Sequence, residues 1–125
     1  MVIKFDKALT GTCLFWWSIA AYGGMPDDIF GRTNKLIELV LPTNIKHIGR
    51  DFCSGSSITS ITIPASVQSI GADAFRNCGH LISIIFNGTI TQWEAIEKAN
   101  YWCSNYQDVT VHCIDGDIVI PVIDF

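Results

Sequence analysis

The sequence predicts an α/β-type repeat solenoid, a fold in which similar short strands stack one coil above another. The segment Leu36–Pro42 returns as Ile58–Pro64, and it returns again without the proline as Leu81–Phe86. Each copy carries apolar residues at its first, fourth and sixth positions. Self-similarity with a period of roughly 20 to 30 residues and this spacing is typical of a leucine-rich repeat, in which every repeat adds one strand. We therefore expect a short leucine-rich-repeat stack.

The stretch between the strands repeats as well. It contains two apolar positions, a glycine directly after the second of them, and an aromatic residue that closes the turn. The two central repeats hold Ile45, Ile48, Gly49 and Phe52, and then Val67, Ile70, Gly71 and Phe75. We expect these apolar side chains to form the core, because one repeat cannot bury its own apolar side and the stack must cooperate.

The first 35 residues are predicted to form an N-terminal cap, a degenerate repeat that departs from the pattern because it has no neighbour on one side. On the repeat grid Met25 takes the place of Ile48, while Cys13 and Trp16 take strand positions. A signal peptide is the alternative for residues 1–20, since two lysines precede a largely apolar stretch there.

Residues 91–125 are predicted to form a C-terminal cap made of a helix and a β-hairpin. Thr91 and Glu94 have the spacing of a capping box, which would begin a helix over roughly 92–99. Asp115-Gly116 is a strong signal for a two-residue hairpin turn, and that turn would place Cys113 opposite Ile118.

Length and charge limit the domain number and the class of partner. The 125 residues fit one domain, 1–125, with the repeats over 36–90 between the two caps. The net charge is −4 and no run of Lys or Arg occurs, so no nucleic-acid partner is expected, because such binding rests on neutralised phosphates. Beyond the N-terminal stretch, no apolar run approaches the roughly 20 residues of a membrane span.

The sequence carries no catalytic pattern. No phosphate loop or pair of catalytic carboxylates occurs, so we predict no enzymatic activity, no metal and no cofactor. The five cysteines, at positions 13, 53, 78, 103 and 113, form no CxxC pair. A disulfide between Cys103 and Cys113 is an alternative for an exported chain. A zinc site of these two with His112 is another, although its spacing fits no structural zinc pattern. Separately, Asn87-Gly88-Thr89 is a sequon for N-linked glycosylation.

The residues between the inward strand positions form the candidate binding site. In a leucine-rich repeat such residues line the concave surface, and alternation along a strand places them on the face opposite the core. We expect a strip with a polar row beside a more apolar row. Its residues are Glu38, Val40, Ser60, Thr62, Ser83 and Ile85. A solvated sheet face without a ligand is the alternative reading of this strip.

The repeats resemble the BspA-type leucine-rich-repeat family, whose repeats read L-x-x-I-x-I-P-x-x-V-x-x-I-G-x-x-A-F-x-x-C-x-x-L. The segment 58–81 agrees with this pattern almost position for position. The agreeing residues are Ile58, Ile61, Ile63, Pro64, Val67, Ile70, Gly71, Ala74, Phe75, Cys78 and Leu81.

The resemblance covers about residues 25–120, and it implies a cell-surface or secreted protein that acts in adhesion. It implies a protein partner, either a host matrix protein or a cell-surface protein. The alternative is a structural capping or spacer fragment of a longer repeat protein, with no ligand of its own.

Overall fold

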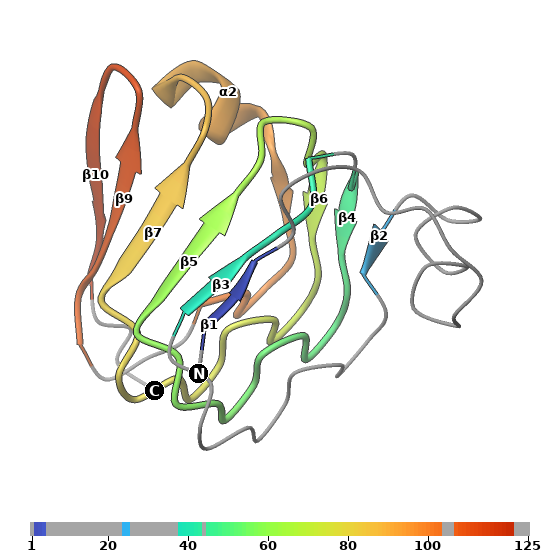
Figure 1. Ribbon diagram of the computed structural model, residues 1–125, viewed down its shortest axis with the longest axis vertical. Helices are drawn as coiled ribbons and strands as arrows, with labels where there is room; N and C mark the ends of the chain where they lie inside the picture. Colours follow the sequence, from blue (N-terminus) through green and yellow to red (C-terminus); the bar gives the residue numbers. More distant parts are fainter. Residues whose placement is uncertain (1, 5–23, 26–37, 44, 104–106, 122–125) are drawn as a thin grey trace.

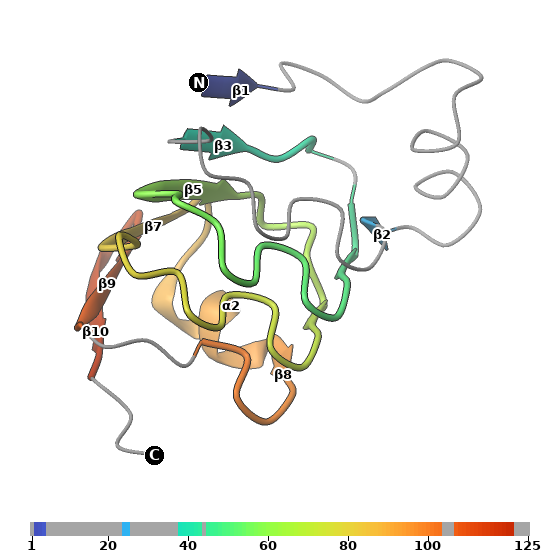
Figure 2. The same ribbon diagram turned by 90° about the horizontal axis from the view of Figure 1, so that it is seen from below.

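The computed structural model describes residues 2–4, 24–25, 38–43, 45–103 and 107–121. The chain winds as a solenoid whose coils contribute to two sheets, a larger and a smaller one, on different sides of the core (Figures 1 and 2). The larger sheet contains, in this order, β1 (Val2–Lys4), β3 (Glu38–Val40), β5 (Ser60–Ile63), β7 (Ser83–Phe86), β9 (Val109–Cys113) and β10 (Gly116–Ile120). Its neighbouring strands run parallel except for β9 and β10, which form an antiparallel hairpin.

The smaller sheet is built from two-residue strands, one per coil. It contains, in this order, β2 (Gly24–Met25), β4 (His47–Ile48), β6 (Ser69–Ile70) and β8 (Glu97–Lys98), all parallel. The one described helix, α2 (Ile90–Ala95), connects β7 to β8. Each described repeat therefore contributes one short strand to each of the two sheets, on either side of the core.

The predicted core lies between the two sheets. Leu39, Ile61, Ile84 and Val111 are direct neighbours on successive strands, and each is completely buried. The aromatic residues extend the core toward the C-terminal side through edge-to-face contacts, which are favourable for aromatic rings. These contacts join Phe52 to Phe75, Phe75 to Trp102, Trp102 to Trp93, and Trp93 to Phe86.

The N-terminal strand differs from the prediction. β1 occupies the place beside β3 that the repeat grid gave to Cys13 and Trp16, and these two residues lie outside the described part of the chain. The repeat grid assumed coils of constant length, whereas the partner of Val2 is Glu38, 36 positions later. β2 pairs with β4 and places Met25 beside Ile48, as predicted.

The C-terminal helix begins and ends earlier than predicted. Its N-cap is Thr89, and the capping box is completed by Gln92, not by Thr91 and Glu94. The helix ends at Ala95 because the next residues join the smaller sheet. The amide of Glu97 donates to the carbonyl of Gln68 at 3.0 Å. The amide of Ala99 likewise donates to the carbonyl of Ile70 at 3.0 Å.

The hairpin has a register two residues away from the predicted one. Val111, not Cys113, lies opposite Ile118, and Cys113 pairs with Gly116. The turn is fixed from outside the hairpin, because the Asp115 carboxylate accepts from the amide of Ile90 at 2.8 Å. A shift of two keeps the same side chains on each face, so Ile118 and Ile120 still pack against the core.

Candidate functional site

The six predicted strip residues lie together on the outward side of the larger sheet, which we call the strand face. Glu38, Ser60 and Ser83 are direct neighbours on successive strands and form one row. Val40, Thr62 and Ile85 form the second row in the same way. Adjacent strands are about 4.8 Å apart, so each row is a continuous line of side chains.

Alternating burial separates the strand face from the core. Along β7 the pattern runs from half-buried Ser83 to buried Ile84, exposed Ile85 and buried Phe86. Ile85 keeps 39% of its surface exposed at the centre of the sheet. An exposed aliphatic residue on a central strand gives this face an apolar point of contact.

Both rows continue into the C-terminal hairpin. Thr110 is the neighbour of Ser83, and His112 is the neighbour of Ile85. Beyond them, Val119 extends the first row and Asp117 the second. The predicted strip did not include Thr110 and His112, because the repeat grid ended before β9. The alternation of buried Val109 and Val111 was the signal that could have joined them to the strip.

A histidine–carboxylate contact ends the second row. His112 Nδ1 lies 3.1 Å from Asp117 Oδ1, and both side chains are solvent-accessible. When the imidazole is protonated the contact becomes an ion pair. An exposed pair of this kind contributes about 1 kcal/mol or less to stability, so it acts mainly on the charge of the face.

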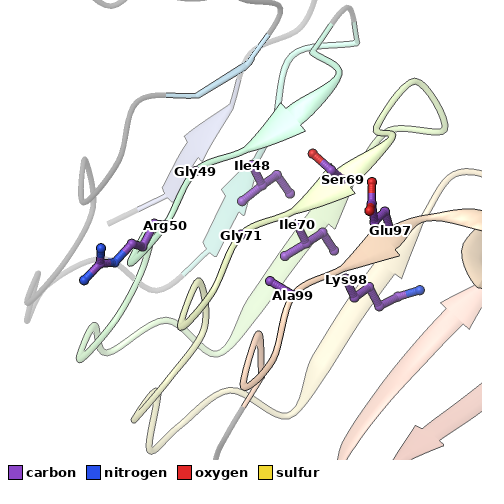
Figure 3. A pocket seen from close by; sticks show the side chains of 9 residues that line it. All are labelled: Ile48, Gly49, Arg50, Ser69, Ile70, Gly71, Glu97, Lys98 and Ala99. Carbon is purple, nitrogen blue, oxygen red and sulfur yellow. The ribbon is translucent and has the colours of Figure 1, made fainter.

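A shallow pocket of about 400 Å³ lies over the smaller sheet (Figure 3). Gly49, Gly71 and Ala99 line it together with the polar residues Ser69 and Glu97. His47 Nδ1 contacts Ser69 Oγ at 2.7 Å, while Glu97 is the neighbour of Ser69 on the opposite side. In a catalytic triad the carboxylate orients the histidine. Here the serine stands between the two, which is a different arrangement.

The described cysteines have core environments. Cys53, Cys78 and Cys103 are buried, and Cys113 is half-buried. Burial raises the pKa of the Cys53 and Cys78 thiols, which disfavours the nucleophilic thiolate. Cys103 and Cys113 each carry a thiol and are not joined by a disulfide. Within the described ranges, no three His, Cys, Asp or Glu side chains gather as metal ligands would.

Lys98 takes an inward position that sequence reasoning missed. It is the neighbour of Ile70 in the smaller sheet, where the preceding coils have aliphatic residues. Its ammonium group donates to the carbonyls of Trp93 at 2.7 Å and Ile96 at 3.1 Å, and lies 4.8 Å from the Trp93 ring centroid. Partial burial lowers the pKa of this lysine. The sequence placed Lys98 in the predicted helix over 92–99, and so did not predict its inward position in β8.

The repeated coil and its buried residues agree with a known family model. The model described as the BspA type leucine rich repeat region (6 copies) matches residues 24–114. The chain belongs to the BspA-type leucine-rich-repeat family. No curated protein and no solved structure matches this BspA-type chain significantly. In the described part of the chain, no helix is long and apolar enough to cross a membrane.

Proposed function

We propose that this BspA-type chain is a non-enzymatic protein-binding module whose strand face contacts a protein partner. The observation that carries the proposal is the alignment of the six strip residues into two rows, with exposed Ile85 at the centre. A broad sheet face with few charges suits a macromolecular surface, because affinity at such surfaces comes from a few apolar anchors within a polar surround.

Adhesion at a cell surface, or by a secreted protein, is the setting that the family favours. The partner in that setting is a host matrix or cell-surface protein, and nucleic acid is not a partner. The division of the chain into a cap over 1–35, repeats over 36–90 and a cap over 91–125 belongs to the same proposal.

The C-terminal cap is supported by the direction of the last strand. β10 runs antiparallel to β9, so it interrupts the parallel stacking of coils in the larger sheet. Ile118 and Ile120 pack against the core. Terminal coils of a solenoid need this kind of cover, because their outer side has no neighbouring repeat.

The double substitution Val40→Asp with Ile85→Asp tests the strand face. Binding to a panel of purified extracellular-matrix proteins is measured for the wild type and the variant, with circular dichroism as the check of folding. We expect the variant to keep its spectrum and lose binding, since it replaces both apolar side chains of the second row by charges.

Ile114→Asp is the matched control, because Ile114 is 72% exposed at the hairpin turn and outside the strip. It is expected to bind like the wild type. Equal binding by all three proteins would contradict the role of the strand face. Absence of binding by the wild type to every panel member would favour a structural spacer with no ligand of its own.

A further inference from the structure

We propose that Asn87 is an acceptor site for an N-linked glycan at the border of the strand face. The chain has six asparagines, and Asn87 is the one that Ser or Thr follows two residues later. The intervening residue is Gly88, so the sequon is complete and lacks the proline that would block it.

Asn87 is exposed, whereas the residues at the equivalent position of the two preceding repeats are buried. Pro42 and Pro64 hold the equivalent position after the strand and are buried, whereas Asn87 is exposed. The amide of Asn87 donates to the carbonyl of Ile63 at 3.0 Å. A proline could not make that hydrogen bond because it lacks an N–H. The backbone of Asn87 is thus bound to the end of β5, and this residue is exposed.

The rest of the sequon forms a tight turn between β7 and α2. A Cβ atom on Gly88 would lie 2.6 Å from the Phe86 ring and 2.7 Å from Gln92 Oε1, so a larger residue would force these two side chains to shift. Thr89 is the N-cap, and its hydroxyl accepts from the amide of Gln92 at 3.1 Å. Packing of Gly88 and Thr89 into this turn leaves Asn87 at its outer end.

A glycan on Asn87 would affect how a partner binds to the strand face. Asn87 directly follows Phe86, the last residue of β7, and its exposed side chain is two positions beyond exposed Ile85. A glycan there would border the strand face next to Ile85 and limit how far a partner extends beyond β7. This consequence rests on the proposed function of that face.

Glycan addition is a group transfer from a lipid-linked oligosaccharide pyrophosphate in a eukaryotic secretory pathway. The side-chain amide nitrogen of Asn87 forms a bond to C1 of the first sugar. The bond between C1 and the lipid pyrophosphate breaks, the pyrophosphate leaves with its electron pair, and the nitrogen loses one proton. No oxidant or reductant is needed.

Expression of the full chain behind a cleavable secretory leader in yeast tests the site. Both the secreted and the cell-retained chain are analysed by mass spectrometry before and after treatment with peptide-N-glycosidase. We expect the wild type to carry one oligosaccharide that the enzyme removes. Asn87→Gln is expected to abolish it, and Thr89→Ser to retain it, because serine keeps the hydroxyl that both the sequon and the N-cap require.

A leader-cleaved wild type of unmodified mass would overturn the proposal, as would a glycan that persists in Asn87→Gln. The mass of the chain does not depend on any partner. Failure of glycosylation and failure of strand-face binding are therefore distinguishable.

Discussion

Gly71 lies where two successive coils approach each other closely at the smaller sheet. Its amide donates to the carbonyl of Ile48 at 2.8 Å. A Cβ atom at this position would lie 2.8 Å from the backbone nitrogen of Arg50 and 2.9 Å from the carbonyl carbon of Gly49. Because both neighbours are backbone atoms, they cannot move aside as a flexible side chain would. The glycine of the repeat is thus explained by the spacing between coils.

Gly71→Ala is therefore expected to lower the free energy of unfolding by about 1–3 kcal/mol, the usual cost of forcing an extra methyl group into a packed site. Gly79→Ala is the control, since a Cβ atom there meets nothing within 4 Å. Urea denaturation of both variants measures the difference. Equal midpoints for the two would mean that the coils can separate to accept the methyl group.

The helix α2 shows how neighbouring elements determine a local boundary. Both Thr89 and Thr91 could cap a helix from their sequence context. The Thr89 hydroxyl accepts from the amide of Gln92, and the amide of Thr89 donates to Gln92 Oε1 at 2.8 Å. Asp115 of the hairpin turn reaches the first helical amide from outside. The hairpin and the helix therefore fix each other's position.

Replacement of each threonine by alanine separates the two candidate caps. Thr89→Ala is expected to cost about 1 kcal/mol of stability, the usual value for an N-cap, and Thr91→Ala close to nothing. Thermal unfolding followed by circular dichroism gives the comparison. A larger loss for Thr91→Ala would contradict the observed start of the helix.

At the scale of the whole molecule, most of the fold could be predicted from the spacing of the repeats. The inward residues, the two rows of the strand face and the place of Met25 follow from a constant period, because each coil repeats the same contacts with its neighbour. Where the period changes, the prediction failed. The paired residues of β1 and β3 are 36 positions apart and those of β3 and β5 are 22 apart, so a constant period misplaced the strand beside β3. Hydrogen bonds donated to the preceding coil by Glu97 and Ala99 keep Glu97–Lys98 outside the helix.

The candidate site was predictable to the same extent. Its central six residues lie on repeats of regular length, whereas Thr110 and His112 come after the irregular segment and join the rows through the pairing of β7 with β9. The inward position of Lys98 was not predicted either, because it depends on the pairing of β6 with β8 in the smaller sheet.

The central claim is that the strand face, and not the side of the smaller sheet, meets the partner. Thr62→Arg places a large cation in the middle of the second row, and Gln68→Arg places the same charge at an exposed position beside the smaller sheet. Affinity for the matrix protein that binds the wild type is measured by surface plasmon resonance. We predict a loss of about tenfold or more for Thr62→Arg, a change of at least about 1.4 kcal/mol, and no comparable loss for Gln68→Arg. Unchanged affinity for Thr62→Arg together with a loss for Gln68→Arg would contradict the claim.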